Sequence, residues 1–333
     1  MPEEDRTIHQ PIHPDIRAKL DPEYVAFHDK YMQYVQRDES KIWDGSARTA
    51  PSLPFGGAEM VEVASIQDIE LPDFKLRVYV PESNQIRSLP CLLWFHGGGW
   101  AIGGLNDGKD FCSFVSRVGY RLAPEHPYPA AINDAVESLR WVCSAGKDHF
   151  NLDLERIAVG GTSAGANLAI VLCLKAAKKL DIRICFQLLI VPVIDNTAIA
   201  DGIWDQNHNA PWLTPSRMIW YRRMYMPLES DWKNWDASPN LAPEALLTSM
   251  PPTWMAISEQ DLLAPEAHLF AVQLRELKVP VTVYEVEGGT HSILALCGAV
   301  TRGKLMIKEA ANALRKALNR EFCEEYLSRG ERR

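Results

Sequence analysis

The 333-residue sequence lacks the features that mark membrane, secreted and nucleic-acid-binding proteins. No window approaches the roughly 18 to 20 apolar residues that cross a bilayer, and the most apolar run, 184–194, has only the length of a strand. The first residues are acidic and lack the apolar stretch of a secretory signal. A net charge of −8 gives no electrostatic reason for a polyanionic partner. We therefore expect neither a membrane span nor a nucleic-acid partner.

Cysteine and histidine are sparse and show no paired spacing. The seven cysteines are an odd number, and several lie in apolar runs where a reduced thiol packs as a small hydrophobic group. This distribution favours a reducing, cytoplasmic setting. The nine histidines show none of the close, repeated spacing of metal ligands, so we expect no metal and no cofactor.

From about residue 60, short β-type runs alternate with helical patterns. Strands are expected at 60–69, 76–80, 91–95, 157–159, 185–191, 254–258 and 281–286, and helices at 163–179, 266–277 and 300–322. The first two strands resemble an antiparallel pair, and the later alternation indicates a mostly parallel sheet with helices on both faces. The predicted divisions are an N-terminal helical part (1–50), a core (51–194 and 251–322), an insertion (195–250) and a polar tail (323–333). No internal repeat is found.

Two segments outside the predicted core have helical patterns. Apolar and aromatic residues between 13 and 36 recur in steps of three and four, and Asp21-Pro22 divides them into two short helices. This stripe either faces the core or forms a lid over a pocket. The insertion is rich in tryptophan and has a helical pattern at 216–226.

The segment Gly161-Thr162-Ser163-Ala164-Gly165 follows an apolar strand and precedes a helix. In that setting the pattern G-x-S-x-G predicts a sharp strand-to-helix turn that exposes the serine oxygen of a nucleophile. The free N–H groups at the helix start favour a developing oxyanion. A chance glycine turn is the alternative interpretation.

A second glycine-rich segment, His96-Gly97-Gly98-Gly99-Trp100, follows the expected strand at 91–95. Its unshielded backbone N–H groups can bind an anion, and together with the N–H of Ala164 they would form an oxyanion hole. His96 is more plausibly a residue that orients this loop than a catalytic base. A flexible glycine turn is again the alternative.

A serine nucleophile needs a base and an acid that orients the base. His291 follows the last expected strand and Asp261 follows the one before, so both lie at the sheet edge that carries sites in open α/β sheets. The chain order Ser163, Asp261, His291 is the order of α/β-hydrolases. Glu259 is the rival acid, but it lies within or at the end of its strand.

These motifs, together with residues 120–127, resemble the hormone-sensitive-lipase-like family of α/β-hydrolases over most of residues 60–320. The resemblance implies an α/β-hydrolase fold with a helical cap formed by the N-terminus and the insertion. It implies a serine carboxylesterase for short-chain or small aromatic or polyketide-type acetyl esters, with Gly98, Gly99 and Ala164 as the oxyanion-hole donors and Gly97 in support. An amide, lactone or formamide hydrolase would use the same residues.

A non-catalytic receptor on the same scaffold is a further alternative, which the presence of His291 disfavours. A homodimer is another expectation. Aromatic residues of the cap and of the glycine-rich loop are expected either to line an acyl or alcohol pocket or to pack the cap on the core. They are Trp100, Trp204, Trp212, Trp220 and Tyr221.

One stretch departs from the family. Tyr120 follows His96 after only 24 positions, which is shorter than in the members this chain resembles. A shortened first crossover helix, a damaged fourth strand or an exon lost from the predicted gene would each explain the difference. A strand over 113–118 would place Arg117 in the buried centre of the sheet, where an unpaired charge is costly.

Overall fold

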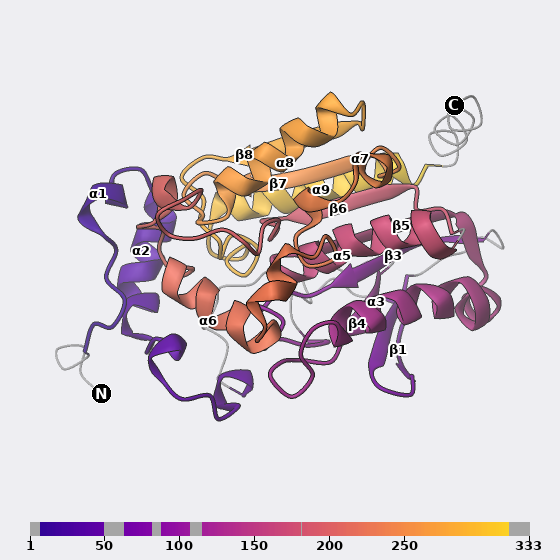
Figure 1. Cartoon of the computed structure of the whole chain (residues 1–333), viewed down its shortest axis with the longest axis horizontal. Helices are drawn as coiled ribbons and strands as arrows, with labels where there is room; N and C mark the ends of the chain where they lie inside the picture. The colour runs from indigo at the N-terminus through magenta and orange to yellow at the C-terminus, as the bar shows by residue number, and fades with distance from the viewer. Residues whose placement is uncertain (1–6, 50–62, 82–87, 107–114, 181, 320–333) are drawn as a thin grey trace.

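The computed structural model describes residues 7–49, 63–81, 88–106, 115–180 and 182–319. In this part of the chain an eight-stranded sheet has the order β1-β2-β4-β3-β5-β6-β7-β8 (Figure 1). β2 is antiparallel to β1 and β4, and all other neighbours are parallel, which confirms the predicted mostly parallel sheet. The strands are β1 (Ser65–Glu70), β2 (Lys75–Val80), β3 (Leu89–Phe95), β4 (Val115–Gly119), β5 (Leu152–Thr162), β6 (Phe186–Ile190), β7 (Thr253–Ser258) and β8 (Val281–Val286).

The short stretch before Tyr120 does not remove the fourth strand. β4 lies between β2 and β3 and pairs with β3 from Leu92↔Val115 to Phe95↔Val118. Arg117 is indeed buried, at 3% exposure, and its guanidinium carbon lies 5.2 Å from the ring centroid of Tyr79. This cation–π contact offsets part of the cost of burying the charge. A damaged strand is therefore the wrong alternative, while residues 107–114 of the crossover lie outside the described ranges.

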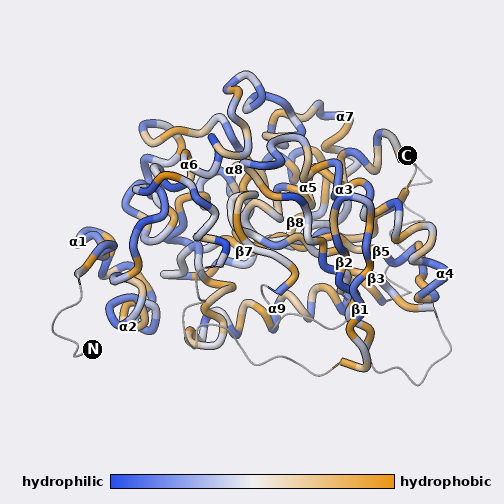
Figure 2. The backbone as a smooth tube through the Cα atoms, turned by 90° about the horizontal axis from the view of Figure 1, so that it is seen from below, coloured by the Kyte–Doolittle hydropathy of each residue, from blue (hydrophilic) through white to orange (hydrophobic). Residues whose placement is uncertain are grey.

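Helices cover both faces of the sheet because successive strand residues point to opposite sides. Leu93 and Phe95 of β3 belong to one hydrophobic cluster with α3 (Ala130–Trp141), α5 (Ala164–Lys175) and α8 (Ala264–Glu276). Leu92 and Trp94 belong to the other cluster, with α9 (Thr301–Ala317) and the N-terminal helices. In Figure 2, α9 accordingly lies on the opposite side of the sheet from the other three helices.

The N-terminal segment forms two short helices, α1 (Pro14–Arg17) and α2 (Pro22–Lys30), as predicted. The Asp21 carboxylate caps α2 by accepting a hydrogen bond from the N–H of Glu23 at 2.7 Å. The predicted stripe faces the core, since Leu20 and Tyr24 are buried in the cluster that contains α9.

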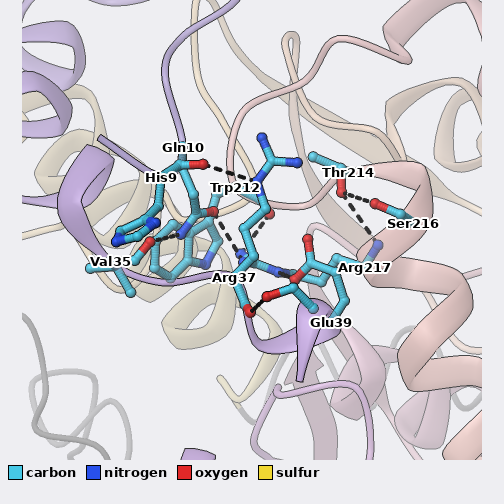
Figure 3. Close-up of polar contacts among 10 residues, drawn as sticks. His9, Gln10, Val35, Arg37, Glu39, Trp212, Thr214, Ser216 and Arg217 are labelled. Atoms are coloured by element: carbon cyan, nitrogen blue, oxygen red, sulfur yellow. Dashed lines mark hydrogen bonds and ion pairs between the residues drawn. The ribbon is translucent and has the colours of Figure 1, made fainter. Parts of the chain in front are cut away.

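The insertion folds into helices and turns, and its part around α6 lies beside the N-terminal segment (Figure 1). Its longest helix, α6 (Pro215–Tyr225), is held to the N-terminal segment by Arg217. This buried guanidinium lies 2.8 Å from the Glu39 carboxylate and 3.0 Å from the Gln10 side-chain oxygen, and it stacks over Trp212 (Figure 3). The shorter helices of the chain include α4 (Lys147–Phe150) and α7 (Glu244–Leu247).

Candidate active site

The turn between β5 and α5 presents Ser163. Its backbone has φ 56° and ψ −121°, a left-handed conformation that is rare for a residue with a side chain. The two flanking glycines permit the turn. A Cβ on Gly161 would lie 2.4 Å from the backbone of Gly165, and a Cβ on Gly165 would lie 2.2 Å from the carbonyl oxygen of Phe95. The pattern G-x-S-x-G is thus required by close backbone contacts.

Three residues from separate loops form one hydrogen-bonded chain. The Nδ1 of His291 lies 2.9 Å from Asp261 Oδ2, and the Nε2 lies 2.9 Å from Ser163 Oγ. Because the carboxylate accepts, Nδ1 carries the proton and Nε2 is free to accept the serine proton. Asp261 is 1% exposed, so solvent competes little for its carboxylate.

Glu259, the alternative acid, binds a backbone group of the loop before His291, whereas Asp261 binds the imidazole. Glu259 Oε2 accepts a hydrogen bond from the N–H of Gly288 at 2.8 Å, so Glu259 supports the loop that carries His291. Asn207 of the insertion also supports the acid loop, because its side-chain amide donates to the carbonyl oxygens of Glu259 and Asp261 at 3.0 and 2.6 Å. Sequence analysis missed Asn207, which belongs to no motif.

The glycine-rich loop lies against the nucleophile turn. A Cβ on Gly97 would lie 3.1 Å from the carbonyl oxygen of Thr162 and 3.4 Å from Ser163 Cβ. His96 stacks on Tyr120 at 4.2 Å between ring centroids, and the Tyr120 hydroxyl donates to the His96 carbonyl at 2.8 Å. These two contacts hold His96, within the loop, against Tyr120.

The backbone N–H groups proposed for the oxyanion hole come from this loop and from α5. Gly98 has φ 107°, and its carbonyl accepts hydrogen bonds from the N–H groups of Ala101 and Ile102, which fixes the turn. Ala164 is the first residue of α5, where an N–H has no partner within the helix. Gly97 of this loop and Ala164 of α5 therefore lie next to Ser163, and the N–H groups of Gly98, Gly99 and Ala164 stay the predicted donors.

Two of the aromatic residues expected to line a pocket lie in the core instead. Trp100 is fully buried and stacks on Tyr225 at 4.6 Å between centroids. Trp204 is also fully buried, and its Nε1 donates to Glu266 Oε2 at 2.9 Å. The expectation that these two rings line a pocket is wrong. Both rings lie between packed layers, where the burial of their apolar surface stabilises the fold. Trp212, half-buried, packs under the Arg217 guanidinium.

Trp220 and Tyr221 occupy different positions on α6. Trp220 lines a groove of about 760 Å³ between α6, the N-terminal segment and the loop after β4; we call it the α6 groove. Tyr221 is buried, and a Cβ on Gly99 would lie 2.2 Å from its Cγ, so its ring covers the glycine-rich loop. The two rings contact each other at 4.9 Å between centroids. Tyr221 therefore contacts both the glycine-rich loop and a ring that lines the α6 groove.

A buried acid joins the insertion to α8. Glu266 Oε1 accepts hydrogen bonds from the N–H groups of Ile194 and Asp195 at 2.8 and 3.2 Å. Burial raises the pKa of Glu266 to about 8, because the desolvation of the carboxylate outweighs the lowering of the pKa by these hydrogen bonds. Arg222 lies over the rings of Trp204 and Trp232, and burial lowers its pKa to about 10. This cluster connects the cap to the sheet.

Within the described residues, no group of three or more His, Cys, Asp or Glu side chains is arranged to hold a metal ion. The same part of the chain contains no helix with the length and hydropathy of a membrane span.

An eight-stranded sheet with a serine at a strand-to-helix turn, bonded to a histidine and an aspartate, defines the class of α/β-hydrolase. A family model described as "alpha/beta hydrolase fold" matches residues 92–295, and the chain belongs to this family. The resemblance to hormone-sensitive-lipase-like hydrolases is thereby confirmed.

Related proteins extend over most of the chain. It is 35% identical to an AB hydrolase superfamily protein of Schizosaccharomyces pombe, over 91% of this chain and 96% of the relative. It is 32% identical to carboxylesterase NlhH of Mycobacterium tuberculosis, over 73% and 80%. Among solved structures, a thermostable esterase of Pseudomonas putida aligns with a TM-score of 0.79 at 27% identity, over 90% of this chain and 98% of the esterase.

Proposed function

We propose that this protein is a serine carboxylesterase that forms an acyl-enzyme on Ser163. The observation that carries the proposal is the continuous hydrogen-bonded chain from Asp261 through His291 to Ser163, with both distances at 2.9 Å. A serine hydroxyl is a weak nucleophile near neutral pH, and an adjacent imidazole held by a buried carboxylate is the arrangement that activates it. The relationship to a carboxylesterase supports the choice of ester substrates.

In the proposed reaction, His291 Nε2 takes the Ser163 proton as Oγ attacks the ester carbonyl carbon. The carbonyl oxygen becomes an oxyanion, which the N–H groups of Gly98, Gly99 and Ala164 stabilise. The imidazolium then protonates the leaving alcohol. Water then attacks the acyl carbon while His291 Nε2 takes one of its protons. The bond between the acyl carbon and Oγ breaks as His291 returns that proton to Oγ, which releases the carboxylic acid and restores Ser163. Asp261 keeps its charge throughout and stabilises the imidazolium.

The substrates we propose are esters of short acyl groups, among them small aromatic or polyketide-type acetyl esters. The α6 groove supports an aromatic group, because Trp43 and Trp220 lie in its wall with ring centroids 5.7 Å apart. Aromatic side chains stack favourably with aromatic ligands. We propose that Tyr221 limits the acyl length, because its buried ring lies against Gly99, one of the proposed oxyanion-hole donors.

A fluorophosphonate probe tests the proposed nucleophile. Such probes form a covalent bond with an activated serine, so we expect one adduct, located on Ser163 by peptide mass spectrometry. The Ser163→Ala variant should not be labelled, while the surface variant Ser249→Ala should be labelled like the wild type. Labelling that persists in Ser163→Ala would refute the assignment.

The substrate class is tested with p-nitrophenyl esters from acetate to palmitate, together with the matching amide, p-nitroacetanilide. We expect the highest kcat/KM for acetate or butyrate and little hydrolysis of the amide. Best activity on palmitate would refute the short-chain preference, and faster hydrolysis of the anilide would favour the amidase alternative.

A further inference from the structure

We propose that the turn between α1 and α2, together with Arg302 of α9, clamps the loop that carries His291. This loop, Glu287–His291, is called the histidine loop. The inference rests on the proposed role of His291 and adds that Asp21 and Arg302 are positioning residues for it. Neither residue touches the reacting atoms.

The peptide groups of Gly288 are held from two sides. Its N–H donates to Glu259 Oε2 at 2.8 Å, and its carbonyl accepts a hydrogen bond from the N–H of Asp21 at 3.0 Å. The carbonyl of Gly289 accepts a further bond from the N–H of Gln260 at 2.8 Å. The acid loop therefore holds one side of the histidine loop, and the N-terminal helices hold the other.

The contact with the N-terminal turn leaves no free space. Gly288 has φ 61°, and a Cβ on it would lie 2.6 Å from the backbone nitrogen of Asp21 and 3.0 Å from the carbonyl oxygen of Lys19. Both neighbours are backbone atoms, which cannot turn aside as a flexible side chain can. The glycine is thus needed for this approach of two chain segments as well as for its own conformation.

Arg302 joins the same two segments through its guanidinium group. Its Nε lies 2.9 Å from Asp21 Oδ2, and its Nη1 lies 3.0 Å from Glu287 Oε2. The preceding residue reinforces the contact, because the Thr301 hydroxyl donates to Glu23 at 3.0 Å. Asp21 therefore caps α2 with one carboxylate oxygen and binds Arg302 with the other.

His291 lies three positions after Gly288, so a shift of the clamped peptide moves the imidazole. Proton transfer needs the ring within hydrogen-bond reach of Ser163 and Asp261 at once, and small misplacements of catalytic groups lower the rate of the chemical step. Loosening the clamp should therefore lower kcat more than it raises KM, because the α6 groove and the glycine-rich loop are not altered.

The first test compares Arg302→Gln with Arg17→Gln. The control breaks the exposed ion pair between Arg17 of α1 and Asp29 of α2, which does not include a residue of the histidine loop. Hydrogen–deuterium exchange of the peptide that spans 287–292 is measured by mass spectrometry, together with kcat and KM for p-nitrophenyl acetate. We expect Arg302→Gln to speed exchange in this peptide severalfold and to lower kcat about threefold at nearly constant KM, with no effect of Arg17→Gln.

A second pair of variants compares two left-handed glycines. Gly288→Ala and Gly45→Ala both place a side chain at positive φ, but nothing lies within 4 Å of a Cβ on Gly45. We expect Gly288→Ala to lower kcat roughly tenfold or more and Gly45→Ala to leave it nearly unchanged.

The outcomes separate the two proposals. Equal exchange of the histidine loop in Arg302→Gln and Arg17→Gln refutes the clamp, whatever the activity. Faster exchange with unchanged kcat refutes the positioning role. If Arg302→Gln exchanges faster but the wild-type protein hydrolyses no ester, the proposed function is refuted and the clamp is still supported.

Discussion

Glu266 illustrates how burial changes a single ionisable side chain. Its carboxyl group is fully removed from solvent, and desolvation raises its pKa from 4.5 to about 8. The folded protein therefore binds a proton there between about pH 4.5 and 8, whereas the unfolded chain has released it. The stability contributed by this proton is fully present below pH 4.5 and is lost as the pH rises through 8.

The variant Glu266→Gln tests this linkage. We expect the free energy of unfolding of the wild type, relative to the variant, to fall by a few kcal/mol between pH 5 and 8. Urea denaturation at unit pH steps measures the difference between the two proteins. A difference that stays constant with pH would contradict the raised pKa.

Trp220 offers a residue-scale test of the α6 groove. We expect Trp220→Ala to raise KM for phenyl-substituted esters several times more than for ethyl acetate, because the variant removes one aromatic wall. The matched control is Trp235→Ala, since Trp235 is a half-buried ring of the insertion that contacts Lys175 away from the groove. Steady-state kinetics on both esters provides the measurement, and equal KM changes would contradict the proposal.

The residues brought together at Ser163 could be predicted because each stands at a strand end beside a glycine or in a known pattern. Asn207 and Glu266 could not, since the need for a polar partner arises only when the insertion packs on the core. Glu266 carried one weak signal: it stands between Ala264 and Ala267 near the start of α8. The misplacement of Trp100 and Trp204 has the same origin, because sequence does not tell a pocket wall from a packed interface.

At the scale of the elements, a buried ion pair between Arg217 and Glu39 holds α6 against the N-terminal segment. Arg217 and Glu39 have side-chain exposures of 4% and 8%, so removal of either charge leaves the other buried without its partner. We expect Arg217→Met to lower the free energy of unfolding by about 3–5 kcal/mol. The double variant Arg217→Met/Glu39→Leu should recover part of this loss.

An exposed pair provides the control for this prediction. Lys75 and Glu70 are more than half exposed, so Lys75→Gln should cost less than about 1 kcal/mol. Urea denaturation monitored by tryptophan fluorescence measures all three variants. A loss for Arg217→Met no larger than for Lys75→Gln would show that α6 is held by packing alone.

β4 shows where element-scale prediction fails. Its sequence, Val-Ser-Arg-Val-Gly, has a central charge and resembles no buried strand. Pairing with two neighbours and the ring of Tyr79 nevertheless accommodate it. The other strands were found because their apolar runs and bounding turns are local properties, whereas β4 depends on contacts that a local pattern does not contain.

For the whole molecule, the cysteines in the described ranges are not joined in disulfides, and Cys91, Cys173 and Cys185 are buried. Burial raises the pKa of the Cys91 thiol to about 12, so it stays protonated and unreactive. We expect the Tm to be the same with and without a reducing agent, as measured by calorimetry. A Tm that drops on reduction would reveal a disulfide. A cytoplasmic setting and a homodimer stay predictions.

The clamp on the histidine loop also has a consequence for synthesis. Glu23 bonds Thr301 across 278 positions, so α2 meets its partner only after the elements between α2 and α9 have been translated. Contacts of such long range form late, because closing the intervening chain costs entropy before any contact compensates for it. A ribosome-bound chain stalled before α9 can contain Ser163, Asp261 and His291 and still not hold them in register. Ester hydrolysis by such a chain would then begin only once α9 has been made and has packed against the N-terminal helices.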